Sequence, residues 1–288
     1  MRETISKGRK IKCALLNALM YLSAGIICLV LIGIIGYILY RGLPHITPRF
    51  LTSKPSLLRG TTGILPNILN TLYLILMTLI VVLPVGVGAA IYLNEYAANK
   101  KVVRVIELAT ETLSGIPSII YGLVGMLIFV QFCSLGTSLL AGALTLVIMT
   151  LPTIIRTTQE SLKTVPIGYR EGSLALGAGK WYMIRTVVLP SAIDGIVTGC
   201  ILSVGKIVGE SAALLYTAGM ANEILGITDA VKPGNAGSSL TVALYMYAKE
   251  RGEFETAFAI ASILLVLTFV INMSAKLTAR ILKKRGNR

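Results

Sequence analysis

Two ionisable residues, Lys206 and Glu210, lie inside an otherwise apolar stretch of the sequence. Placing either charge at the centre of a lipid bilayer costs at least about 2.5 to 3.5 kcal/mol, so both side chains must face protein or water. Their i, i+4 spacing would put them on one face of a helix, although lysine before glutamate is the weaker order for an ion pair. The pair therefore predicts either a structural ion pair or the lining of an ion path.

Four polar side chains lie in or beside apolar stretches and could hydrogen-bond an ion or the waters around it. They are Asn70, Ser118, Tyr121 and Ser211. Serine and asparagine also join membrane helices to one another, so a packing role is the alternative for each of them.

The sequence offers no constellation for enzymatic chemistry. The four cysteines stand singly, and the only histidine, His45, has no cysteine or carboxylate close in the sequence to complete a metal site. No P-loop sequence (Gly, four residues, Gly-Lys, then Ser or Thr) occurs, so the chain itself is not expected to hydrolyse ATP. We expect neither an enzyme nor a resident metal or cofactor.

The elements that carry these residues must lie in a membrane. The 288 residues are 55% hydrophobic and only 14% charged, with a mean hydropathy of +0.78, which excludes an ordinary soluble domain. Backbone groups have no water partners in lipid, so a spanning chain forms helices or a closed barrel. Long charge-free runs, in place of short alternating strands, favour helices.

The charge-free runs predict six membrane-spanning helices, on a requirement of about 20 residues for each crossing. The expected ranges are 13–39, 69–93, 107–131, 138–156, 193–216 and 256–275. The run from Thr112 to Ile155 would be about 65 Å long as one helix, so it must fold back, at the polar segment Gln131–Ser138. The first run is too long for the apolar core of a secretory signal. The expected fold class is all-α, a polytopic membrane helix bundle.

The basic residues predict the orientation of the bundle. With six spans, 19 lysines and arginines fall on the side of the two termini and 7 in the opposite segments, 41–66 and 217–255. The positive-inside rule then puts both termini in the cytoplasm. The expected organisation is a cytoplasmic tail over 1–12 and one transmembrane domain over 13–288. The net charge of +14 reports this topology and predicts no nucleic-acid partner.

The expected cytoplasmic loop over 157–190 is longer than a connection needs and contains signals of two short helices. Thr164 could cap and Gly177 could end a helix from Ile167 to Leu176, with Pro166 in its first turn. A second helix would run from Lys180 to Val188 and end at Pro190. The first helix could lie on the membrane surface or dock by its apolar residues in a groove on a partner.

This loop resembles the EAA motif of the permease subunits of ABC importers. The matching residues are Glu171, Gly172, Ser173, Leu174, Ala175 and Gly177, followed by Val187-Val188-Leu189-Pro190. The match departs from the motif at Gly172 and Ser173, where alanines are usual, and at Val187, where isoleucine is usual. The resemblance implies a type I ABC-importer permease fold, in which this loop is a coupling helix that inserts into a cleft of the ATPase subunit.

Other segments narrow the resemblance to the permeases of phosphate importers, of the PstA type. These segments are Asn70-Thr71-Leu72, Ser114 to Gly122, Ala175 to Trp181 and Gly209 to Ala212. The resemblance implies four partners: a second, PstC-like permease subunit, a PstB-like ATPase dimer that uses ATP and Mg²⁺, a soluble PstS-like phosphate-binding protein, and phosphate itself. It also implies a multi-pass protein of the cytoplasmic membrane.

The resemblance is least complete at Lys206, because related permeases usually have an arginine at this position. Lysine keeps a positive potential for an oxyanion but lacks the planar fork that holds two phosphate oxygens. With Glu210, Ser211, Asn70, Ser118 and Tyr121, it forms the expected substrate path. An importer of another oxyanion, such as molybdate or sulfate, and a secondary transporter that works alone are the alternatives.

Overall fold

The computed structural model describes residues 7–55 and 62–286, and within these ranges the regular elements are all helical. The α-helices are α1 (Lys7–Gly42), α2 (Pro48–Thr52), α3 (Leu65–Ile91), α4 (Lys100–Ser114), α5 (Ser118–Gly125), α6 (Leu139–Thr164), α7 (Ile167–Ala175), α8 (Lys180–Met183), α9 (Leu189–Gly209), α10 (Ala212–Thr217), α11 (Ile227–Ala230), α12 (Leu240–Tyr245) and α13 (Phe254–Gly286). Short 3₁₀ or π-helical segments adjoin them: η1 (Leu43–His45), η2 (Tyr92–Tyr96), η3 (Met126–Phe132), η4 (Ile184–Val188) and η5 (Met246–Glu250). The predicted all-α fold is confirmed, and part of the predicted tail over 1–12 lies outside the described residues.

In the described part of the chain, 5 helical stretches are long and apolar enough to cross a membrane. They are Lys12–His45, Leu65–Tyr96, Leu139–Thr164, Lys180–Gly209 and Phe254–Thr278. A sixth crossing results if the bent pair Lys100–Ser114 and Ser118–Phe132 counts as one span. The expected count of six depends on that pair.

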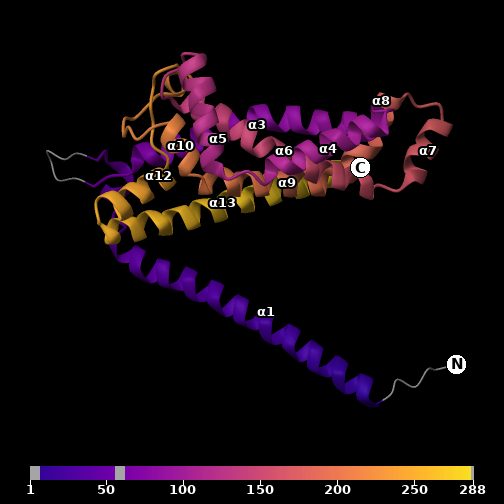
Figure 1. Cartoon of the computed structure of the whole chain (residues 1–288), viewed down its shortest axis with the longest axis horizontal. Helices are drawn as coiled ribbons and strands as arrows, with labels where there is room; N and C mark the ends of the chain where they lie inside the picture. The colour runs from indigo at the N-terminus through magenta and orange to yellow at the C-terminus, as the bar shows by residue number, and fades with distance from the viewer. Residues whose placement is uncertain (1–6, 56–61, 287–288) are drawn as a thin grey trace.

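Helices α3, α4, α6, α9 and α13 lie side by side along the long axis of the molecule (Figure 1). Their shared core includes fully buried Leu74 of α3, Leu146 and Met149 of α6, and Ile260 of α13. Helices α10 and α12 lie at one end of this bundle, and α7 and α8 lie at the other (Figure 1). The first turns of α1 and the last turns of α13 point toward the α7 end.

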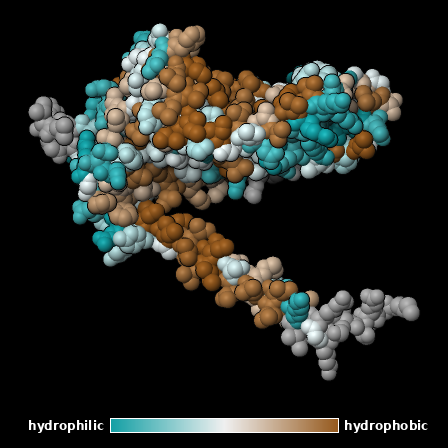
Figure 2. Space-filling model, viewed as in Figure 1, coloured by the Kyte–Doolittle hydropathy of each residue, from teal (hydrophilic) through white to brown (hydrophobic). Residues whose placement is uncertain are grey.

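Helix α1 leaves the bundle and touches it at one end only (Figure 1). At this end the Ser262 hydroxyl donates to the Ile38 carbonyl at 3.1 Å, and the rings of Tyr37 and Phe258 meet edge to face at 5.6 Å. None of the most apolar stretch of Lys12–His45 is buried. Figure 2 shows this apolar surface along the arm, so α1 presents it to lipid or to another chain.

The predicted span over 107–131 is not one straight helix, because the chain bends by 99° between α4 and α5. Pro117 has no N–H for a helical bond and disfavours the helical conformation at Ile116, and helix α4 stops at Ser114 just before them. The Tyr121 hydroxyl donates to the Leu113 carbonyl at 2.7 Å and ties the two arms of the bend together. The chain then folds back before Leu139, within the predicted polar segment.

Gly122 allows α5 to cross α10 closely, since a Cβ at this position would lie 2.7 Å from the Ala213 Cα. We expect Gly122→Ala to lower the free energy of unfolding by about 1 to 3 kcal/mol through overpacking, measured as thermal stability of the purified protein in detergent. Gly88→Ala is the matched control, because a Cβ there meets nothing within 4 Å. It should leave stability unchanged or raise it by up to about 1 kcal/mol. Equal effects of the two substitutions would contradict the close crossing.

Candidate functional site

Helix α7 stands away from the bundle and has no buried residue (Figure 1). It covers Ile167–Ala175, close to the predicted Ile167–Leu176, and Gly177 follows with the left-handed φ of +84° that ends a helix. The predicted cap at Thr164 is wrong: Thr164 is the last residue of α6, and its hydroxyl donates to the Ser161 carbonyl. The residue before the first turn is Pro166.

The residues of the EAA-like segment lie open on α7. Glu171, Gly172, Leu174, Ala175 and Gly177 are exposed and Ser173 is partly buried. Among the described residues, the Glu171 carboxylate has no ion-pair partner. The apolar side chains Leu174 and Leu176 are 48% and 90% exposed. A free carboxylate beside exposed leucines is the surface that a docking partner would cover.

The second predicted helix of the loop begins at Lys180 as expected but does not end at Pro190. It continues through η4 into α9, so Lys180–Gly209 is one helical stretch. The π-helical turn η4 widens the helix just before Pro190, where the proline ring would otherwise meet the carbonyl of the preceding turn. The non-helical part of the loop is therefore shorter than 157–190.

The loop is anchored to the end of α3 by an ion pair that sequence reasoning missed. Arg170 donates to the Glu95 carboxylate from Nε at 3.2 Å and from Nη2 at 3.0 Å. Its guanidinium also donates to the carbonyls of Val165 and Leu162, at 2.7 and 2.8 Å. A signal for this pair existed, because Glu95 is the one charged residue between Arg59 and Lys100.

Helix α9 ends at Gly209, between the two intramembrane charges. The prediction that Lys206 and Glu210 share a helical face is therefore wrong. Glu210 has extended backbone, and its carboxylate accepts the Ala213 N–H of α10 at 3.0 Å. The Thr241 hydroxyl donates to the carbonyls of Val208 and Glu210, at 3.1 and 2.9 Å, which satisfies groups left open at the end of α9. Ser211 is the partly buried residue that precedes α10.

Lys206 is bonded to α6 and not to Glu210. Its ammonium donates to the Met149 carbonyl of α6 at 3.0 Å, in the turn before Pro152. Between Lys206 and Glu210, both of them described residues, there is no ion pair within 4.0 Å. The ammonium of Lys206 thus lies half-buried in a membrane-spanning helix, hydrogen-bonded to a carbonyl oxygen of α6.

The remaining predicted site residues divide between two places. Tyr121 is buried in the α4–α5 bend, and Ser118 is partly buried in the first turn of α5, which crosses the α10 helix that Glu210 caps. Asn70 is fully buried in α3, and its Nδ2 donates to the Ser238 carbonyl at 3.3 Å. Asn70 therefore holds the segment that follows α10.

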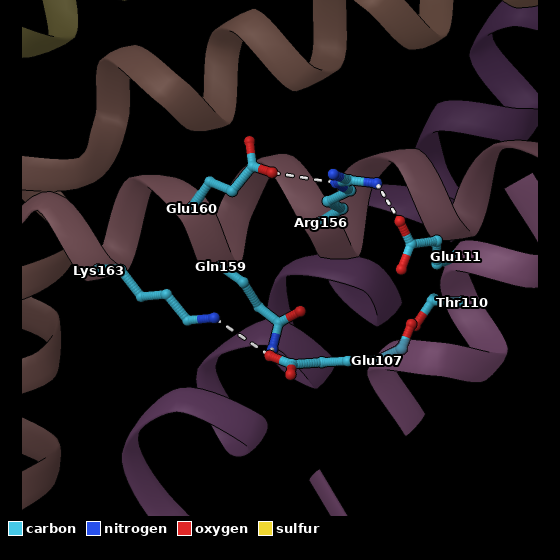
Figure 3. Close-up of a pocket in the computed structure, with 7 residues that line it drawn as sticks. All are labelled: Glu107, Thr110, Glu111, Arg156, Gln159, Glu160 and Lys163. Atoms are coloured by element: carbon cyan, nitrogen blue, oxygen red, sulfur yellow. Dashed lines mark hydrogen bonds and ion pairs between the residues drawn. The ribbon is translucent and has the colours of Figure 1, made fainter. Parts of the chain in front are cut away.

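A charged hollow of about 220 Å³ lies between α4 and α6 (Figure 3). Its lining residues are Glu107, Thr110, Glu111, Arg156, Gln159, Glu160 and Lys163. Arg156 pairs with Glu160 at 3.0 Å and Lys163 with Glu107 at 3.1 Å, on exposed or half-exposed side chains. Three carboxylates against two cations leave this hollow unsuited to an anion, and exposed pairs of this kind contribute only about 0 to 1 kcal/mol each.

The chain matches the sequence family described as "Binding-protein-dependent transport system inner membrane component" over residues 82–285. A Bacillus subtilis (strain 168) protein named "Probable ABC transporter permease protein YqgI" is 35% identical over 96% of this chain and 98% of its own length. The Mycobacterium bovis "Phosphate transport system permease protein PstA 2" is 42% identical over 57% of this chain, and the match spans 54% of that relative.

Solved structures agree with these sequence relatives on the fold. A bacterial alginate ABC transporter, solved with an alginate-bound periplasmic protein, gives a TM-score of 0.67 at 16% identity over 96% of this chain and 98% of its own. The family match includes the anchored α7 loop and the break between Lys206 and Glu210. The chain belongs to the family of inner-membrane permease components of binding-protein-dependent ABC importers.

Proposed function

We propose that this chain is the PstA-type permease subunit of an ATP-driven phosphate importer. The observation that carries the proposal is α7, an exposed helix with a free Glu171 carboxylate at one end of the membrane bundle (Figure 1). Such a helix suits insertion into a cleft of an ATPase subunit. The similarity to relatives named as phosphate transport permeases supports phosphate as the substrate.

The proposed complex contains a second, PstC-like permease subunit, a PstB-like ATPase dimer and a soluble PstS-like phosphate-binding protein. The apolar, unburied arm of α1 supports a second membrane subunit, since a partner helix could cover it. In this proposal the ATPase subunit uses ATP and Mg²⁺, and this chain is expected to need no cofactor of its own. Substrate recognition belongs mainly to the binding protein, so this chain contributes half of a translocation path.

We place both termini in the cytoplasm with α7, in a multi-pass protein of the cytoplasmic membrane. Two observations support this orientation. The start of α1 and the end of α13 both point toward the end of the bundle where α7 lies (Figure 1). In a six-span topology, 19 of the 27 basic residues belong to that side.

Lys206 is the proposed source of positive potential on the anion path, and the neighbouring carboxylate of Glu210 shapes the α9–α10 break beside it. Lys206 is half-buried, and its ammonium is bonded to a carbonyl oxygen and is not ion-paired with Glu210. Ser211, Ser118, Tyr121 and Asn70 are proposed to line or support the same path.

Uptake of labelled anions by cells that rely on this chain tests the proposal. We expect uptake of phosphate that unlabelled phosphate suppresses and that sulfate and molybdate do not. Uptake of sulfate or molybdate instead would make the chain the permease of another oxyanion importer. Phosphate uptake that persists when the ATPase subunit is absent would identify a transporter that works alone.

A further inference from the structure

Two residues of the α7 loop, which is the segment 165–180, contact the same short segment, η2, at the end of α3. Arg170 in α7 pairs with Glu95, and the Lys180 ammonium at the start of α8 lies 4.8 Å from the centre of the Tyr96 ring. Glu95 and Tyr96 are the last two residues of η2. A displacement of the loop therefore acts on η2 at two adjacent residues.

The Arg170–Glu95 pair is the best shielded ion pair in the described part of the chain. The two side chains are 17% and 7% exposed, whereas the other pairs have at least one partner near or above half exposure. The guanidinium donates to Glu95 and to two backbone carbonyls, so its orientation is fixed on several sides. Removing one partner of a pair this buried leaves an uncompensated charge, so the contact resists separation.

Helix α3 connects η2 with the opposite end of the bundle. At about 1.5 Å per residue, the 32 residues of Leu65–Tyr96 extend about 48 Å. Near its start, Asn67 Nδ2 donates to the Asn222 side chain at 2.9 Å and to the Ser238 carbonyl at 3.2 Å. The Thr71 hydroxyl accepts the Leu240 N–H at 2.9 Å. The first turns of α3 thus hold the segment 222–240, on the side far from α7.

We propose that Arg170 and Glu95 act as a coupling clamp, through which movement of α7 displaces α3 and so reaches the segment 222–240. This inference rests on the proposed function, because it assumes that the ATPase moves α7. The chain itself connects α7 to α6 and α9. The clamp gives the movement a second route, through α3. Arg170 and Glu95 are positioning residues, since they act through α3 and touch no substrate. The clamp links the ATPase side to the side where a binding protein would dock.

The test uses the whole complex in proteoliposomes, with the phosphate-binding protein supplied on the outer side. It compares the Glu95→Gln variant with the wild-type complex. Glutamine keeps the shape of the side chain and removes the charge that holds Arg170. We expect the amount of phosphate transported per ATP hydrolysed to fall about tenfold, within the range for residues on a coupling route. Affinity for the ATPase subunit should stay unchanged, because the exposed face of α7 is intact. Arg170→Lys, which keeps the charge, should lose less.

Glu160→Gln is the matched control, because it neutralises an exposed carboxylate on α6 that pairs with Arg156, and Arg156 also pairs with Glu111 of α4. It should leave the transport ratio unchanged. Hydrogen exchange gives an independent readout: trapping ATP on the wild-type complex should alter exchange in 222–240, and Glu95→Gln should weaken that response.

Two results would overturn the clamp. One is an unchanged transport ratio in Glu95→Gln, and the other is a loss of ATPase affinity in parallel with transport, which would mean that the pair only orders the loop. Failure of the proposed function itself looks different, because the wild-type complex would then show no ATP-dependent phosphate uptake.

Discussion

Glu171→Lys is expected to abolish phosphate uptake by releasing the ATPase subunit from this chain. The Glu171 carboxylate is exposed on α7 and has no partner within the described chain, so its partner would lie on the ATPase. Breaking a buried charged contact across an interface costs about 2 to 5 kcal/mol, and reversal adds repulsion. We expect affinity for the ATPase subunit to fall at least about thirtyfold, measured by co-purification and by titration of the purified permease pair.

The control for this change is Glu250→Lys, an identical charge reversal on an exposed residue at the other end of the bundle. It should leave ATPase affinity unchanged. Glu171→Gln should lose less affinity than the lysine variant, because it removes an attraction without adding a repulsion. Normal affinity and uptake in Glu171→Lys would show that α7 is not the docking helix.

Lys206→Met is expected to lower phosphate transport about thirtyfold while assembly with the partner subunits stays normal. At an effective dielectric constant of about 20, a unit charge acts on another about 8 Å away with about 2 kcal/mol, which corresponds to that factor. Lys206→Arg keeps the charge and should retain most of the transport. The measurement is the initial rate of phosphate uptake at saturating binding protein.

Lys206→Gln separates the electrostatic role from a structural one. Lys206 also donates to the Met149 carbonyl, and glutamine can keep a hydrogen bond to α6 without the charge. We expect Lys206→Gln to transport as poorly as the methionine variant. Full transport in Lys206→Gln would mean that Lys206 only joins α9 to α6.

The apolar helices and the α7 loop could be predicted from the sequence because each has a strong local cause. Long charge-free runs have no stable alternative to helices in lipid, and Pro166 and Gly177 enclose α7 at its start and end. These signals depend on neighbouring residues alone. They gave the fold class and the EAA-like helix Ile167–Ala175 nearly as the structure has them.

The breaks and anchors could not be predicted because their causes are far apart in the sequence. Helix α9 ends before Glu210 because Thr241 and the Ala213 N–H bind the groups that the break leaves open. An i, i+4 pattern cannot reveal such a stop. The Arg170–Glu95 contact joins residues 75 positions apart, and only the packing of α3 against α6 brings them together.

Phosphate accumulation in proteoliposomes tests the central claim most directly. The vesicles would contain this chain with its second permease subunit and the ATPase, with the binding protein supplied on the outer side. The account predicts that phosphate accumulates against its gradient when ATP is present, that omission of ATP or of the ATPase stops it, and that sulfate and molybdate are not taken up. Accumulation without ATP, or uptake of sulfate or molybdate in place of phosphate, would contradict it.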